Sequence, residues 1–175
     1  MSEVIRVVCA SFLAIALLAC AKTPGVAAAE GSLIHYRFDQ VDGERVPNAS
    51  GAQYSGRIEG NARITRLPDA GGATVLSLDG TNGCIQIEGS EALHLGEDGF
   101  AIAATVRFKE SGSVEGAPET HDMIVMKPGE YLFGRTRRSL YFNIHDGNDW
   151  VAGITGGDCQ PNTWIHAAVL VERIY

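Results

Sequence analysis

The sequence lacks an apolar run long enough to cross a bilayer as a helix. Its most apolar stretch is Val7–Leu18, which is shorter than the roughly 20 residues that a permanent span needs. The sequence is also poor in positive charge, with 14 Lys and Arg against 21 Asp and Glu and a formal net charge of −7. Because no basic stripe is present to neutralise phosphates, we expect no nucleic-acid partner.

Catalytic motifs are missing as well. The sequence contains no G-x-S-x-G elbow, no H-E-x-x-H helix and no phosphate-binding P-loop. Glu97 and Asp98 are adjacent, so on a strand they would face opposite sides, and we interpret them as turn residues. The sequence therefore predicts a protein that is not an enzyme, although carboxylates from separate segments meeting in space remain an alternative.

No window shows a convincing helical stripe, whereas short alternating segments are frequent. Turns are well supplied by 21 glycines. Strands are expected at 33–38, 62–67, 74–80, 83–89, 100–108, 123–127, 130–134, 139–147, 150–155 and 162–171. The last of these is apolar on both faces, which predicts a buried strand with Trp164 in the core. Regularly spaced short strands without helices predict an antiparallel β-sandwich or barrel.

Residues 1–29 have the layout of an export signal, with Arg6 before the apolar stretch and small residues after it. Two processing routes remain open. Ala27 and Ala29 form an A-x-A pattern with release before Glu30, and "LLACA" at 17–21 resembles a bacterial lipobox whose Cys20 would be lipidated. Both routes predict an extracytoplasmic location in the periplasm, in the cell envelope or as a secreted protein. Membrane contact is expected only through a lipid on Cys20.

Cys84 and Cys159 are the two cysteines outside the export signal and its processing zone. Thiols outside the cytoplasm tend to be oxidised. A disulfide between the two would close a loop of about 75 residues and stabilise the fold by about 4 kcal/mol. The alternative is two separate buried thiols that behave as small hydrophobes.

Six segments in order resemble a laminin-G-like domain of the concanavalin A-like lectin/glucanase superfamily. They are "LIHYRFD", "VPNASGAQYSGRIEGNA", "VLSLDGTNGCIQIEGSEALHLG", "FAIAATVRF", "MIVMKPGEYLFGRTRRSLYFNIHDG" and "NTWIHAAVLV". The resemblance implies that residues 30–175 form an antiparallel β-sandwich of the jelly-roll type in a bacterial exported protein.

The sequence departs from the family pattern at two points. Thr105 stands where the family often has Trp. The family continues beyond the "W-h-h-v-A" strand with closing strands, which implies that this domain is incomplete and truncated at its C-terminus. Glycosidases of the superfamily carry an E-x-D-x-x-E strand, which this sequence lacks.

The resemblance also implies a structural calcium ion, since many relatives hold one in their loops with carboxylates and carbonyls. Asp39, Asn48 and Asp79 lie in the segments that would supply its ligands. The alternative is that each of them is a turn former that bonds its own backbone. The oxygen-rich stretch "HDGNDW" at 145–150 is better explained as a two-residue hairpin turn.

Trp150 follows this polar turn, and an exposed ring there would offer a stacking surface for a sugar. The basic cluster of Arg135, Arg137 and Arg138 is interpreted as a solvated loop. The sequence thus favours a non-catalytic recognition module for a glycan or a cell-surface protein, within a larger exported protein. The alternatives are an exported structural domain without a ligand and a polysaccharide-degrading enzyme on the same fold.

Overall fold

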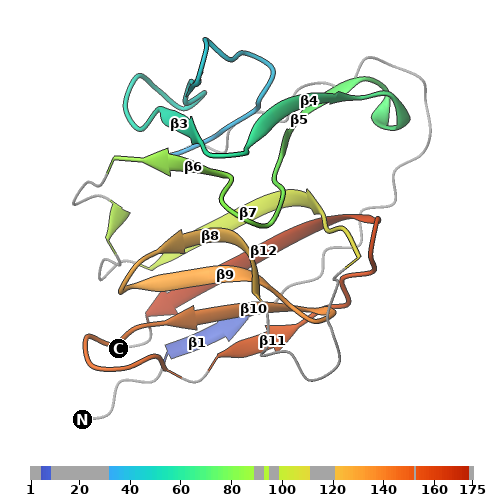
Figure 1. Ribbon diagram of the computed structural model, residues 1–175. Helices are drawn as coiled ribbons and strands as arrows, with labels where there is room; N and C mark the ends of the chain where they lie inside the picture. Colours follow the sequence, from blue (N-terminus) through green and yellow to red (C-terminus); the bar gives the residue numbers. More distant parts are fainter. Residues whose placement is uncertain are drawn as a thin grey trace. The chain divides into compact units, whose positions relative to one another are not determined.

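The computed structural model describes residues 5–8, 32–88, 93–94, 99–110, 121–151 and 153–173 (Figure 1). The chain divides into two compact units, and each is described by itself. Unit 1 comprises Met1–Ala16 and Glu91–Tyr175, and unit 2 comprises Leu17–Ser90. All strand pairs of the described residues are antiparallel. The all-β prediction is therefore confirmed.

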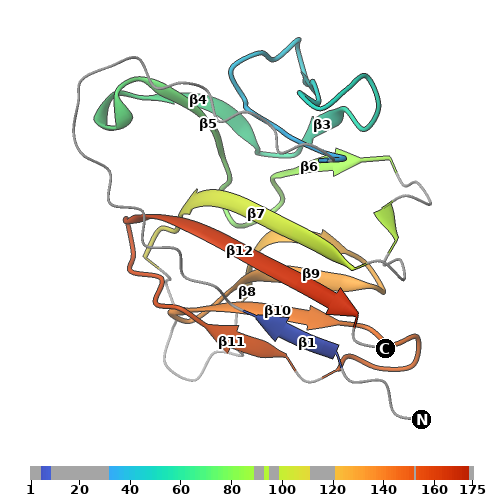
Figure 2. The same ribbon diagram turned by 180° about the vertical axis from the view of Figure 1, so that it is seen from behind.

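Unit 1 is a β-sandwich of two antiparallel sheets (Figures 1 and 2). One sheet has the order β11-β10-β9-β8 and the other the order β1-β12-β7. The first sheet consists of β8 (His121–Lys127), β9 (Tyr131–Thr136), β10 (Ser139–Ile144) and β11 (Ile154–Gly156). The second consists of β1 (Ile5–Val8), β7 (Phe100–Arg107) and β12 (Trp164–Arg173). β1 lies within residues 1–29, the predicted export signal. Removal of that signal, and of β1 with it, stays a prediction.

The core of unit 1 lies between these two sheets. Phe133 and Phe142 from one sheet pack against Ala167, Val169 and Val171 from the other. Each of these strands places every second side chain on the core face, as the two-residue period of a strand requires. The apolar residues of the alternating segments therefore meet in a single layer, as in other sandwiches.

β12 corrects one prediction, because only one of its faces is buried. Ala167, Val169 and Val171 point into the core, whereas Leu170 is 41% exposed and Trp164 is 38% exposed. Trp164 is therefore not a core residue. It pairs with Arg107 on β7, and the guanidinium carbon of Arg107 lies 5.1 Å from the centre of the indole ring.

Unit 2 contains a three-stranded sheet and a separate hairpin. The sheet has the order β2 (Arg45–Val46), β3 (Gly56–Glu59) and β6 (Cys84–Ile87), and the hairpin pairs β4 (Arg63–Leu67) with β5 (Ala73–Ser77). A short 3-10 helix, Pro68–Ala70, forms the turn of this hairpin. Among the described residues of the chain, no helix is long and apolar enough to span a membrane.

Residues 33–38 were expected to form a strand, but they belong to none of the strands of unit 2, so this prediction is wrong. The backbone N–H of His35 donates instead to the side-chain oxygen of Asn48 at 2.7 Å, and the N–H of Ala49 donates to the carbonyl of His35 at 2.8 Å. Phe38 has a φ of 60°, which ends the extended conformation. A side-chain amide thus takes the place of a neighbouring strand.

Candidate functional site

The turn that carries Trp150 lies at the end of β10 in unit 1. His145 and Trp150 form an isolated antiparallel bridge, and the N–H of Asp146 donates to the carbonyl of Asp149 at 3.0 Å. One carboxylate oxygen of Asp146 accepts the N–H groups of Asn148 and Asp149, each at 2.8 Å, and these bonds lower the pKa of Asp146. The hairpin interpretation of this loop is therefore confirmed.

The indole of Trp150 is held in place yet open to solvent. It meets the ring of His145 edge to face, with 5.3 Å between the ring centres and 83° between the ring planes. The N–H of Val151 donates to the carbonyl of Ile144 at 2.8 Å, which ties the following residue to β10. Trp150 remains 38% exposed, and Val151 and Ile154 are exposed too. We call these three residues the Trp150 edge.

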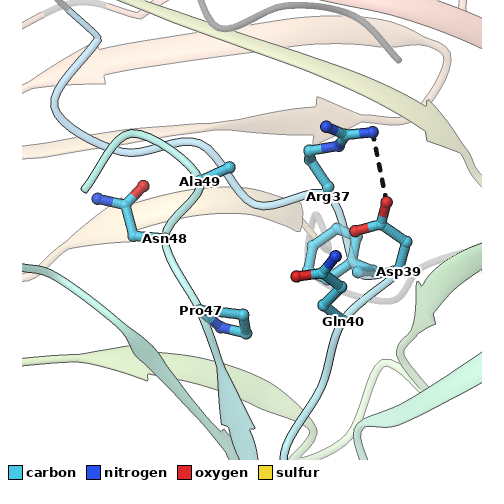
Figure 3. A pocket seen from close by; sticks show the side chains of 7 residues that line it. Arg37, Asp39, Gln40, Pro47, Asn48 and Ala49 are labelled. Carbon is cyan, nitrogen blue, oxygen red and sulfur yellow. Dashed lines mark ion pairs between the residues drawn. The ribbon is translucent and has the colours of Figure 1, made fainter. Parts of the chain in front are cut away.

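Unit 2 contains a cavity of about 150 Å³ (Figure 3). Its lining residues are Arg37, Phe38, Asp39, Gln40, Pro47, Asn48 and Ala49. The guanidinium of Arg37 and the carboxylate of Asp39 form an ion pair at 3.3 Å, whereas the side chain of Asn48 points away from that pair. The cavity thus brings together two of the three residues predicted to bind calcium. Asp79 is not among its lining residues.

Asn48 already makes four hydrogen bonds within the protein. Its oxygen accepts the N–H groups of His35 at 2.7 Å and Ser50 at 3.1 Å. Its nitrogen donates to the carbonyls of Leu33 at 2.8 Å and Gln53 at 2.9 Å. Because both lone pairs of the oxygen are occupied, Asn48 serves as a loop former in this conformation.

Asp79 also bonds within its own turn. One oxygen accepts the N–H groups of Thr81 at 2.9 Å and Asn82 at 3.4 Å, and the other accepts the amide of Asn61 at 2.8 Å. These hydrogen bonds lower the pKa of the Asp79 carboxyl. Among the described residues, no group of three or more His, Cys, Asp or Glu side chains could hold a metal ion. The structural calcium ion at Asp39, Asn48 and Asp79 stays a prediction.

The two cysteines of the predicted disulfide are free thiols in the structure. Cys84 is exposed on β6 in unit 2, and Cys159 is buried in unit 1, where burial raises the pKa of its thiol. Their pairing stays a prediction. Cys20 lies outside the described residues, as do Glu97 and Asp98, and lipidation also stays a prediction.

Arg135 corrects the interpretation of the basic cluster as a solvated loop, because it is only 3% exposed. Its Nε lies 2.9 Å from a carboxylate oxygen of Asp122, and its Nη2 contacts the same oxygen and the carbonyl of Lys109 at 3.2 Å. Its guanidinium also lies 4.5 Å from the centre of the Phe108 ring. The alternation of β9 places Arg135 on the same face as Phe133, a signal that the sequence did contain.

A second polar cluster joins His94 to the turn after β8. The Oε1 atom of Glu130 lies 2.6 Å from His94 Nδ1 and 2.6 Å from Lys127 Nζ. Sequence reasoning missed it, since the spacing of these residues predicts no contact. A single carboxylate does not make the pair that glycoside hydrolysis requires.

Comparisons with known proteins add nothing to these observations. No protein-family model matches the chain, and searches of curated proteins and of solved structures found no match either. The laminin-G-like assignment therefore rests on the sequence segments alone.

Proposed function

We propose that this protein is a non-catalytic, extracytoplasmic recognition module that binds carbohydrate on a jelly-roll domain of the laminin-G-like type. Two features support this proposal. The first is the ordered series of segments that resemble that family. The second is the antiparallel sandwich of unit 1, which is the fold class that the resemblance implies. Because this architecture hosts many unrelated functions, the ligand is inferred from the site.

The observation that carries the proposal is the Trp150 edge. An indole that is 38% exposed and fixed by His145 presents a rigid apolar surface on which the C–H face of a sugar can stack. Asp149 lies next to it in the chain and accepts the N–H of Trp150 at 2.7 Å through one carboxylate oxygen. Its other oxygen is then an acceptor available to a sugar hydroxyl.

A glycan array on the full chain, followed by calorimetric titration of the best oligosaccharide, tests the proposal. Trp150→Ala is expected to weaken binding by up to about tenfold, since an aromatic contact contributes on the order of 1 kcal/mol. Trp164→Ala is the matched control, because Trp164 is also 38% exposed but lies on the other sheet.

Three results would favour a different function. Equal losses in both tryptophan variants would remove Trp150 as the binding surface. Absence of any glycan binding would favour the structural domain without a ligand, or a protein partner. Release of reducing ends from a polysaccharide panel would favour the enzyme.

A further inference from the structure

The Arg37–Asp39 cavity, defined by the seven residues that line it in unit 2, has a polar wall that is held in place. Arg37 and Asp39 flank Phe38, a bulky residue whose φ of 60° is uncommon. The ring of Phe38 lies 6.3 Å from that of Tyr36, and the hydroxyl of Tyr36 donates to the carbonyl of Tyr54 at 2.5 Å. These two contacts tie the segment 36–38 to Tyr54.

The polar groups of this wall remain available to a ligand. The Arg37 side chain is 45% exposed and the Asp39 side chain is 49% exposed, and the two face each other across 3.3 Å (Figure 3). A guanidinium has five N–H donors and a carboxylate has about four acceptor positions. One ion pair therefore leaves donors on Arg37 and acceptors on Asp39 side by side.

The rest of the cavity is small and has both apolar and polar lining residues. Phe38, Pro47 and Ala49 contribute apolar groups, and Gln40 contributes a carboxamide. A volume of about 150 Å³ accommodates one six-membered ring. It is well below the roughly 300 Å³ at which sites for larger ligands begin.

Charged ligands fit this wall poorly. Calcium requires six to eight oxygen ligands, but Asp39 is the one carboxylate of the lining and stands beside a guanidinium. The oxygen of Asn48 is already occupied by two backbone N–H groups. An anion would in turn be repelled by Asp39. A neutral ligand with adjacent hydroxyls satisfies both groups while the ion pair stays intact.

We propose that the Arg37–Asp39 cavity binds a single neutral monosaccharide unit through two adjacent hydroxyls. One hydroxyl donates to Asp39, the other accepts from Arg37, and the C–H face of the ring packs on the apolar wall. The inference depends on the proposed function only for the class of ligand. Its site lies in unit 2 and does not include Trp150, which lies in unit 1.

The test is a titration of the full chain with a panel of neutral methyl glycosides, in which ligand-observed NMR measures the binding of each glycoside. At least one glycoside is expected to bind, and Arg37→Ala and Asp39→Asn are each expected to weaken it by about fivefold or more. Arg138→Ala is the matched control, because Arg138 and Asp158 form a similarly exposed ion pair at 3.2 Å in unit 1. Circular dichroism confirms that each variant is folded.

Each other outcome overturns the inference. Failure of every glycoside in the panel to bind overturns it, as does binding that survives both substitutions. Binding of calcium chloride or of glycine with loss in Asp39→Asn would assign the cavity to a cation or a zwitterion instead. Trp150→Ala separates the two proposals, because it should abolish stacking at the Trp150 edge and leave the Arg37–Asp39 cavity unchanged.

Discussion

Replacement of Asn48 by alanine is expected to lower the free energy of unfolding by about 4 kcal/mol. The side chain is 8% exposed and makes four hydrogen bonds to backbone groups. Each bond contributes about 1 kcal/mol net, and water has little access to replace those that are lost. A loss of this size is a large part of the roughly 5–15 kcal/mol by which a domain is stable.

Asn143→Ala is the matched control, because Asn143 is also 8% exposed but makes two hydrogen bonds. It donates to the hydroxyl of Tyr141 and accepts the N–H of Ile144. The same reasoning predicts a loss of about 2 kcal/mol for this variant. The difference between the variants thus tests the count of bonds and not burial itself.

Urea unfolding followed by far-UV circular dichroism measures both losses, and hydrogen exchange over residues 33–53 locates that of Asn48→Ala. We expect faster exchange in this segment. A loss for Asn48→Ala no greater than that for Asn143→Ala would refute the view that the Asn48 amide replaces a strand. Should Asn48→Ala be too unstable to purify, Asn48→Asp tests the same contacts, because its second oxygen would face the carbonyls of Leu33 and Gln53.

Two further predictions concern unit 1 and the cysteines. Arg135→Met should cost about 2 kcal/mol, less than for a fully buried pair because Asp122 is partly exposed, whereas Arg138→Ala should cost under about 1 kcal/mol. Urea unfolding compares the two, and equal losses would contradict the structural role of Arg135. A thiol reagent should modify Cys84 in the native protein and Cys159 only after unfolding, as peptide mass mapping would show. Labelling of neither cysteine under denaturing, non-reducing conditions would instead establish the disulfide.

Much of the strand pattern was predictable from the sequence, because the two-residue period and the turn residues mark each strand directly. "FAIAATVRF" illustrates this, since its alternation matches β7. Periodicity failed where both faces are apolar. In β12 the inward Val169 and the outward Leu170 are both apolar, and only the pairing of strands determines which of them reaches the core.

The prediction of a strand at 33–38 was wrong for another reason. Its alternation is that of a strand, but its backbone bonds to the side chain of Asn48, and such competition between side-chain and backbone partners leaves no periodic signal. The candidate sites were predictable only in part. The resemblance singled out Asp39 and Asn48, which do line one cavity, but the contribution of Arg37 depends on the local backbone at Phe38.

Trp150 and Trp164 are the two tryptophans of the chain, and both lie in unit 1. Unit 2 carries Tyr36 and Tyr54 but no tryptophan, whereas unit 1 also carries tyrosines. Burial raises the pKa of Tyr36 to about 12. Selective excitation of indole therefore yields emission from unit 1 alone, without any introduced label. The ultraviolet absorbance of tyrosine, which changes when the phenol loses its proton at alkaline pH, gives a complementary signal to which unit 2 contributes. Comparison of the two optical signals during denaturation would show whether the units unfold in one transition or in two.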